Sequence, residues 1–407
     1  MLSLRASLKP FILLTAGFLL LIGCSATEQT GFTEDVVDGV TIRTYLSSDP
    51  PELNPCRVEE PVFYGAGQGA DTFLLAAASY AGTLPDGGVV IHDWKETRLH
   101  VFEASGEHRL AFGSRGEGPG EFLRASTILV SGDSLLIADF RMQRFLIFRS
   151  DGSFLYQHRF ADPMPTVNSR LALLSGGRYA VRSFRAIPTG STSESLHYRD
   201  EFQVLIFDTG FGSPQEVFQR TGTRSVTKAA DLPLPRPFNP HNMLVGGLGS
   251  YAPFAWMEDD GYRIDFLDLR DGSRWATILP VTPSAVTHEA RESFIQTHIE
   301  WGYPESDLRR FRLPDHTSPV QKLIWDESGR LWAMDWSAFL PRSDEDPYWF
   351  NVFDKDGTWL FRQGVPVEPD YISREGLFVN ARYDAPGDPM VTFYRLVRDG
   401  SETERQY

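Results

Sequence analysis

Short apolar runs, each closed by a turn that ends in glycine, recur along most of the chain. The six turns end at Gly106, Gly152, Gly210, Gly272, Gly357 and Gly400. An apolar, β-branched run that stops at such a turn is typical of a strand entering a hairpin. The pattern therefore predicts repeated short strands, and only one segment reads convincingly as a helix.

A second series lies upstream of each turn, where an apolar residue is followed four positions later by an aromatic residue. Its members are Val90 and Trp94, Leu136 and Phe140, Ala180 and Phe184, Ala252 and Trp256, Trp332 and Trp336, and Val379 and Tyr383. Because side chains alternate along a strand, both residues of a pair lie on one face. Two series in the same order indicate six equivalent units, of which the fourth is the least regular.

Each unit can be divided into four strands, and units of this kind arranged radially make a propeller. The first unit has strands over residues 72–81, 88–94, 98–102 and 108–113. The last unit offers only three, so we expect the alternating residues 39–46 to supply its fourth strand and cover an open sheet edge. The fold class predicted is all-β, a six-bladed β-propeller over residues 34–407.

One segment departs from the repeat, between the fourth and fifth units at about residues 282–316. Thr282 and Pro283 can begin a helix there, and Gly302 can end it. Apolar residues within 294–299 form a stripe along one side of that helix. We expect a small helical insertion, either packed on a blade edge or placed as a lid over the central opening.

The N-terminus has the layout of a signal peptide, with Arg5 and Lys9 ahead of an apolar run over residues 11–22. Twelve residues of helix rise about 18 Å, well short of the roughly 30 Å hydrocarbon core of a bilayer. We therefore expect residues 1–23 to be cleaved rather than to remain as a transmembrane anchor.

The run ends in Leu-Ile-Gly-Cys, residues 21–24, which resembles the lipobox of bacterial lipoproteins. The resemblance implies lipidation of Cys24, a lipidated linker over residues 24–33 and a location on the bacterial cell envelope. Ser25 after the cysteine implies transfer to the outer membrane. Two or three acyl chains hold a protein stably on a membrane. An ordinary secretory signal with a chance cysteine is the alternative.

The formal net charge of the chain is −15, and loss of Arg5 and Lys9 with the signal peptide makes it more negative. Such a charge repels nucleic acid and anionic lipid headgroups, so nucleic acid is not expected as a partner. Once Cys24 carries lipid, Cys56 is the only thiol left and no internal disulfide can form.

Residues 86–160 resemble the NHL family of six-bladed propellers. The resemblance is carried by the glycine-rich turn from Gly113 to Phe122 and by the spacing of an aspartate, a polar loop and an arginine from Asp139 to Arg144. As a whole the chain resembles lipoprotein propellers of bacteria. The resemblance implies the fold but no particular ligand, because propellers host many activities.

Several short motifs resemble catalytic or ligand-binding motifs, but the sequence lacks the partner residues that each of them needs. Ser134 lies in a Gly-Asp-Ser-Leu block typical of one esterase family, but no aspartate in the chain has a histidine three residues later to activate it. The glycines within residues 113–120 lack the lysine and helix of a phosphate site. Most catalytic zinc sites need three protein ligands, and only His92 and Asp93 lie near the expected channel mouth. We predict no catalytic residue, metal ligand or cofactor.

Polar and aromatic residues gather where the second strand of each blade ends, and these ends meet at one face of a propeller. They form a predicted ligand-binding funnel of His92, Asp93, Trp94, Asp139, Arg141, Arg182, Arg185, Asp335, Trp336, Arg382 and Tyr383. Aromatic faces beside arginine and carboxylate groups suit peptides, proteins or carbohydrates. The aromatic residues alone could instead pack between blades.

The sequence thus favours a lipid-anchored envelope propeller that binds a protein, peptide or carbohydrate and performs no chemistry. Two alternatives stay open: a metal-dependent lyase or lactonase with its site in the central channel, and a structural subunit of an envelope complex.

Overall fold

A computed structural model describes residues 31–55, 57–65, 73–125, 127–160, 170–173, 178–191, 195–208, 215–229, 232–233, 244–245, 253–257, 261–300, 302–310, 313–337, 340, 343, 346–373, 376–380 and 391–397. The expected signal peptide and Cys24 lie outside these residues. Within them, no helix has both the length and the apolar character needed to cross a membrane.

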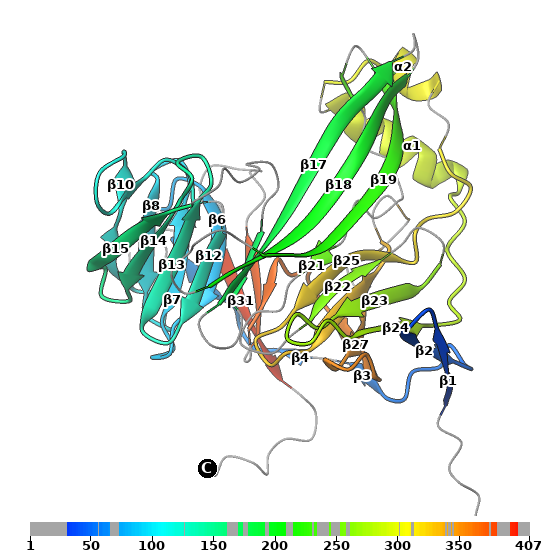
Figure 1. The fold of residues 1–407 in the computed structure, drawn as a ribbon, viewed down its shortest axis with the longest axis horizontal. Helices are drawn as coiled ribbons and strands as arrows, with labels where there is room; N and C mark the ends of the chain where they lie inside the picture. Colours follow the sequence, from blue (N-terminus) through cyan, green and yellow to red (C-terminus); the bar gives the residue numbers. More distant parts are fainter. Residues whose placement is uncertain are drawn as a thin grey trace, which may run out of the picture.

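The first three sheets follow one another along the chain and are built from antiparallel neighbours (Figure 1). The first contains β6 (Ala78–Thr83), β7 (Val89–Asp93), β8 (Arg98–Phe102) and β9 (His108–Phe112). The second contains β12 (Thr127–Ser131), β13 (Ser134–Asp139), β14 (Arg144–Arg149) and β15 (Phe154–Arg159). The third contains β16 (Arg170–Leu173), β17 (Tyr179–Ser191), β18 (Ser195–Phe207), β19 (Gln215–Ala229) and β20 (Leu232–Pro233). Its three long strands project beyond the other sheets.

The other three sheets each recruit strands from near the N-terminus. The fourth contains β21 (Leu244–Val245), β22 (Phe254–Met257), β23 (Arg263–Leu267) and β24 (Arg274–Ile278), extended by β2 (Val40–Tyr45) and β1 (Phe32–Val37). The fifth contains β25 (Val320–Trp325), β26 (Leu331–Asp335), β27 (Tyr348–Phe353), β28 (Trp359–Val365) and β3 (Leu53–Pro55). The sixth contains β29 (Tyr371–Ile372), β30 (Gly376–Asn380), β31 (Val391–Val397), β4 (Arg57–Val58) and β5 (Val62–Tyr64).

Hydrophobic clusters join each sheet to the next and close the ring. Phe112 of the first sheet packs on Phe148 of the second, with ring centroids 5.1 Å apart. Tyr64 of the sixth packs on Phe102 of the first at 5.7 Å. Equivalent clusters link the second to third, third to fourth, fourth to fifth and fifth to sixth sheets. The molecule is a six-bladed β-propeller, as predicted.

The predicted hairpins are confirmed in four blades. Gly106, Gly152, Gly272 and Gly357 lie in turns between the third and fourth strands, and each adopts a positive φ. Positive φ carries little steric cost only for glycine, which explains why this residue closes each turn. Gly210 and Gly400 lie outside the described residues.

An N-terminal segment closes the last blade, but the residues that we predicted for it are wrong. Residues 39–46 contain β2, which pairs in parallel with β24 of the fourth blade. The sixth blade is completed by β4 and β5, which both pair antiparallel with β31. Alternation identified β2 as a strand and gave no prediction for β4 and β5, and it cannot choose between sheet edges that are far apart in sequence.

The helical insertion contains α1 (His288–Glu300) and α2 (Glu305–Arg310). The Ala290 N–H donates to the Thr287 hydroxyl oxygen at 3.2 Å, so the helix begins after a threonine cap rather than at Thr282 and Pro283. The predicted stripe packs into a core of its own that also includes Leu308, and Gly302 ends the helix with a positive φ as expected. α2 contacts β19, so the insertion packs beside the long strands of the third blade (Figure 1).

His298 makes the insertion sensitive to pH. Its ring is buried, and burial lowers its pKa below the ordinary 6.5, a shift that the Phe294 carbonyl 2.7 Å from Nδ1 partly opposes. The unfolded chain therefore takes up a proton at a higher pH than the folded chain, so stability is lost as the pH falls below about 6.5. We expect amide exchange in α1 to be faster at acidic pH than its intrinsic pH dependence explains.

The matched control for this prediction is at the start of the same helix. His298→Gln should flatten the pH dependence of protection in α1, whereas His288→Gln, at an exposed position, should leave it unchanged. Equal protection of wild-type α1 above and below pH 6.5 would contradict the prediction.

Candidate functional site

The aspartate that ends the second strand of the first blade is a structural anchor. The Asp93 carboxylate is buried and accepts four backbone N–H groups, those of Ala76, Ala77, Lys95 and Glu96. Two of these donors precede β6 and two lie in the turn after β7. Asp93 therefore ties the β7–β8 turn to the segment that enters the blade.

Asp139 plays the same part in the second blade. Its carboxylate is buried and accepts the N–H of Leu123 at 2.8 Å and that of Met142 at 3.2 Å. Leu123 belongs to the connection from the first blade, so the turn after β13 and this connection lie at the same end of the blade. The shared geometry explains why the aspartate recurs, and it keeps both carboxylates away from the surface.

Asp335 is held differently. Its carboxylate accepts the side-chain amide of Asn351 at 3.0 Å and pairs with the Arg362 guanidinium at 2.6 Å. Trp336, the next residue, packs partly buried against the core of the helical insertion rather than standing free at a rim. Asp335 therefore stabilises the fifth blade, and Trp336 connects that blade to the helical insertion.

Apart from the exposed residues Trp94 and Arg141, the remaining predicted residues divide into three groups. His92 is buried, and its ring centroid lies 6.0 Å from that of Phe122. Burial lowers the pKa of His92 to about 4. The side chain therefore does not face solvent at the channel mouth, where we predicted it. Arg182 and Arg185 lie within β17 rather than after it, because that strand runs on to Ser191. The rest lie outside the described residues: Arg382, Tyr383 and Cys24.

The glycine-rich turn between the first two blades is organised by a buried arginine. It carries β10 (Ser114–Arg115) and β11 (Glu121–Phe122), which pair in parallel. The Arg144 guanidinium donates to the carbonyl oxygens of Glu117 at 2.8 Å and Glu121 at 2.7 Å, and to the side chain of Gln157 at 2.6 Å. The interpretation of this segment as an interblade turn is confirmed.

Residues 83–227 match the model of a family described as a 6-bladed beta-propeller. The match begins at the last residue of β6 and ends within β19, so it covers most of the first three blades. No curated protein sequence matches the chain.

Three solved propeller-like structures are similar to the chain over most of its length. A protein of Bacteroides fragilis named as exported shares 14% identity, with 88% of this chain and 99% of that chain covered and a TM-score of 0.49. A DUF4221 family member of Bacteroides vulgatus shares 10% identity over 84% and 98%, with a TM-score of 0.40. An inactive virginiamycin B lyase of Staphylococcus aureus, solved with quinupristin, shares 8% over 79% and 95%, with a TM-score of 0.34.

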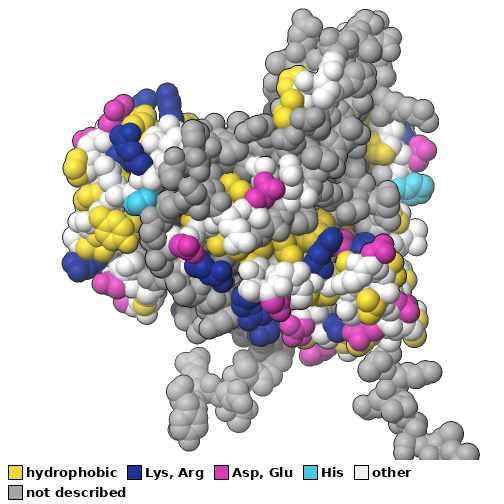
Figure 2. Space-filling model, in the orientation of Figure 1, with side chains coloured by type: hydrophobic (Ala, Val, Ile, Leu, Met, Phe, Trp, Pro, Cys, Tyr) yellow, Lys and Arg dark blue, Asp and Glu magenta, His cyan; other side chains and the backbone are white. Residues whose placement is uncertain are grey.

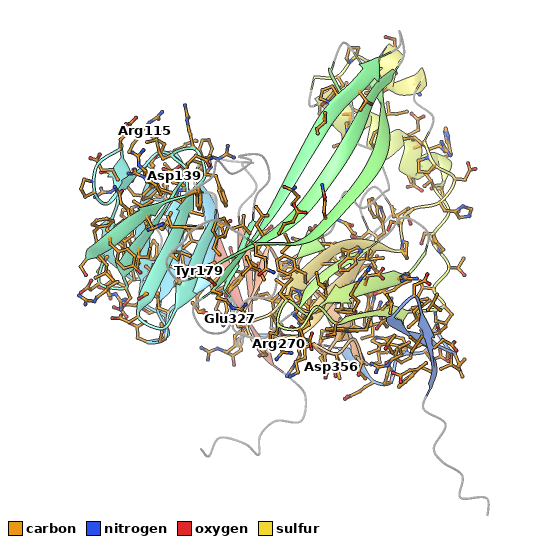
Figure 3. All side chains as sticks on the ribbon, in the orientation of Figure 1. Arg115, Asp139, Tyr179, Arg270, Glu327 and Asp356 are labelled. Atoms are coloured by element: carbon orange, nitrogen blue, oxygen red, sulfur yellow. The ribbon has the colours of Figure 1, made fainter. Side chains whose placement is uncertain are left out.

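The two turns anchored by Asp93 and Asp139, and the connection between the first two blades, carry a surface that the sequence predicted only in part. We name it the basic rim; its members are the exposed residues Trp94, Lys95, Arg115, Arg124 and Arg141. Figure 3 places Arg115 above Asp139 at one end of the second blade, and Figure 2 shows Lys and Arg side chains gathered there. Lys95, Arg115 and Arg124 were missed because they lie in turns outside the repeated positions. In a chain of net charge −15, these segments carry four cations beside the exposed carboxylates of Glu96 and Glu117.

Trp94 is the aromatic centre of the basic rim. The residue is 44% exposed, its backbone N–H donates to the Ala77 carbonyl at 3.0 Å, and the Lys95 ammonium lies 6.0 Å from its ring centroid. Because the backbone on both sides is held by Asp93, the ring is presented from a fixed turn.

A separate pocket lies between the third and fourth blades. Its lining includes Arg178, Ile206, Glu216 and Arg270. The Arg270 side chain is paired with Asp268, with Nε 2.9 Å from the carboxylate, so part of the charge in the pocket is already neutralised. Figure 3 shows Arg270 far from Arg115, so this pocket is not part of the basic rim.

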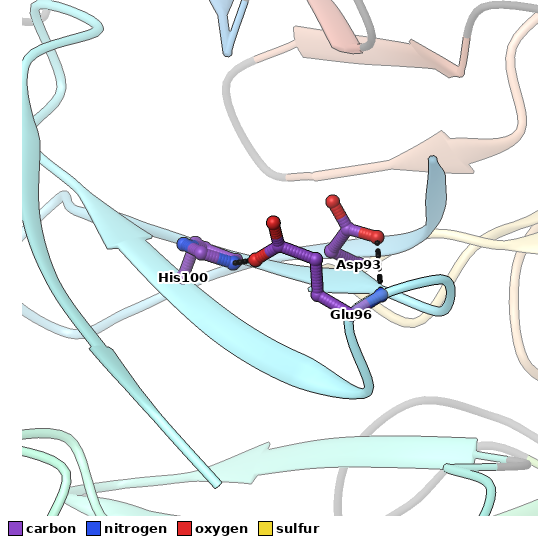
Figure 4. Close-up of side chains that lie close together, drawn as sticks. All are labelled: Asp93, Glu96 and His100. Atoms are coloured by element: carbon purple, nitrogen blue, oxygen red, sulfur yellow. Dashed lines mark hydrogen bonds and ion pairs between the residues drawn. The ribbon is translucent and has the colours of Figure 1, made fainter. Parts of the chain in front are cut away.

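Beside the basic rim, the β7–β8 hairpin brings a glutamate carboxylate close to a buried histidine ring. The buried His100 ring lies with Nδ1 3.2 Å from His108 Nε2, and Phe73 stacks on His108 with centroids 4.0 Å apart. Burial lowers the pKa of His100 to about 4. Glu96 approaches the other side of the ring, with Oε2 3.5 Å from Nε2 (Figure 4).

Proposed function

We propose that this protein is a non-catalytic binding module, held on a bacterial cell envelope by lipid on Cys24. It recognises carboxylate-bearing segments of a partner protein through the basic rim. The lipobox-like residues 21–24 support the anchor, and the basic rim supports the choice of ligand.

The observation that carries the proposal is the combination of an exposed tryptophan with neighbouring cations on turns of fixed backbone. Trp94 and Lys95 follow Asp93 directly, and Arg141 lies two residues after Asp139. Each aspartate accepts backbone N–H groups from its own turn and from the segment that enters its blade. Such anchoring reduces the conformational entropy that the turns lose on binding.

The chemistry of the basic rim matches an acidic protein segment. Arginine guanidinium groups form two parallel hydrogen bonds with a carboxylate, and tryptophan and arginine are enriched at the energetic centres of protein interfaces. Two arginines, Arg124 and Arg141, flank the junction formed by Leu123 and Asp139. We therefore expect the largest loss of binding when both are removed.

The test uses the full lipidated chain in detergent-solubilised envelopes of its native organism. Partners captured by the wild type are compared with those captured by Arg124→Ala plus Arg141→Ala. We expect recovery of the specific partner to fall at least tenfold, and wild-type capture to weaken as sodium chloride is raised, because exposed ion pairs are screened by salt. Cys24→Ala, as a further arm, should release the chain from the membrane and leave capture intact.

The matched control removes the same charge elsewhere. Arg149 and Arg159 are exposed on β14 and β15, and Arg149→Ala plus Arg159→Ala should leave capture unchanged. Equal losses in both double variants would mean that only net charge matters. Capture of a carbohydrate polymer with no protein, or unchanged capture by the Arg124 and Arg141 variant, would overturn the proposal.

A further inference from the structure

Three potential metal ligands meet at the β7–β8 hairpin, apart from the side chains that form the basic rim. Asp93 ends β7, Glu96 lies in the turn and His100 lies in β8. One ligand atom from each lies within 4.8 Å of the other two. Figure 4 shows Glu96 between the other two side chains, with its carboxylate directed to the His100 ring.

His100 supplies an observation independent of the carboxylates. Its side chain is 1% exposed, and its Nε2 is buried without a hydrogen bond. The 3.5 Å between Nε2 and Glu96 Oε2 exceeds the usual 2.7–3.2 Å of an N–H···O bond. A buried ring nitrogen left in this state loses its hydration without replacement, which is costly unless another ligand satisfies it.

The contact of the opposite nitrogen allows a tautomer in which that ligand is a cation. When His100 Nδ1–H donates to His108 Nε2, the Nε2 lone pair of His100 points toward the two carboxylates. Three electron-rich groups that face one another repel, and a divalent cation between them removes the repulsion. The Asp93 carboxylate can take part because Oδ2 accepts only one N–H, from Ala76, and keeps a lone pair.

We propose that Asp93, Glu96 and His100 bind one divalent transition-metal ion of the zinc class. An imidazole with two carboxylates suits zinc and its neighbours, whereas calcium and magnesium prefer oxygen ligands alone. Zinc requires ligand distances of about 2.0–2.2 Å, and the Glu96 side chain, which is 45% exposed, can make the adjustment. The His100–His108 contact orients the ring, as an outer partner does for most metal-binding histidines.

The ion stabilises the hairpin that carries Trp94 and Lys95. Three protein ligands leave a coordination position for water or for a group from a bound partner. The metal site is nevertheless distinct from the contacts proposed for the basic rim, since none of its ligands belongs to that set.

The test measures zinc binding by the full chain in detergent micelles, purified without a histidine tag and stripped with a chelator. Zinc chloride is titrated in competition with a chromophoric chelator. We expect one equivalent to bind with excess calcium and magnesium present, and thermal stability to rise on binding. Glu96→Gln, at an exposed position, and His100→Gln should each weaken binding by more than the roughly 10–100-fold that loss of an outer partner costs.

Variants at other histidines distinguish the proposed three-residue site from adventitious zinc binding by histidines. His108→Gln should weaken zinc binding by roughly 10–100-fold because it removes only the outer partner, and His288→Gln should have no effect. Circular dichroism shows whether each variant is folded. If His100→Gln does not fold, the zinc affinity of Glu96→Gln alone tests the proposal. The proposal is overturned if the wild type binds no stoichiometric zinc, or if Glu96→Gln binds zinc as tightly as the wild type.

Discussion

Replacing Arg144 with alanine is expected to lower the free energy of unfolding by about 3 kcal/mol or more. The guanidinium is buried and donates to three backbone carbonyls of the glycine-rich turn and to Gln157. Hydrogen bonds to a charged group contribute about 1.5–3 kcal/mol each, and relief from burying that charge offsets part of the loss. Urea denaturation followed by tryptophan fluorescence measures the change.

A local readout separates loss of the turn from general destabilisation. The chain should become more sensitive to trypsin at Arg115, inside the turn, under conditions in which both proteins remain folded. Arg149→Ala, at an exposed position of the same strand, should change the free energy of unfolding by no more than about 0.5 kcal/mol. Unchanged cleavage at Arg115 in the Arg144 variant would show that this side chain does not hold the turn.

Replacing Trp332 with alanine is expected to cost about 3–5 kcal/mol of stability. The ring is buried at the junction of the fifth and sixth blades, with Phe350 at a centroid distance of 5.7 Å. Its removal leaves a large cavity in a closely packed interface. The Nε1–H also donates to Asp326 at 2.9 Å, and that bond is lost as well. The change is measured by the same denaturation experiment.

Two further variants divide this effect into its parts. Trp332→Phe keeps most of the packing and loses the bond to Asp326, so we expect a smaller cost of about 1–2 kcal/mol. Trp94→Ala, which truncates an exposed member of the same repeated series, should cost less than about 1 kcal/mol. A similar loss in Trp94→Ala and Trp332→Ala would contradict the assignment of Trp332 to the interblade core.

The fold could be predicted because its main determinants are local. Glycines such as Gly152 and Gly357 adopt positive φ in turns, and apolar runs between turns have the length of a strand. The pairing of the N-terminal strands could not be predicted in the same way. β2 has alternating residues and β5 is a short apolar run, and only the three-dimensional arrangement of distant edges sends one to the fourth blade and the other to the sixth.

The candidate site was predicted less well, for a physical reason. Asp93 and Asp139 recur because each equivalent turn needs an acceptor for backbone N–H groups. Their repetition therefore reflects a structural role in the blade rather than ligand binding. The exposed residues, including Arg115 and Arg124, differ from blade to blade and leave no periodic pattern. Likewise Glu96 and His100 come together only across a hairpin, at a spacing that matches no familiar metal motif.

The closing strands of the sixth blade also decide when the molecule can finish folding. Phe63 pairs with Thr392, so all residues up to Thr392 must be synthesised before this contact can form. Loop-closure entropy rises only slowly with the length of the loop, so the completed ring is not penalised in proportion to this separation. Until then β4 and β5 have no partner strand, and a chain truncated before β31 would keep its early blades while these two strands stayed unpaired.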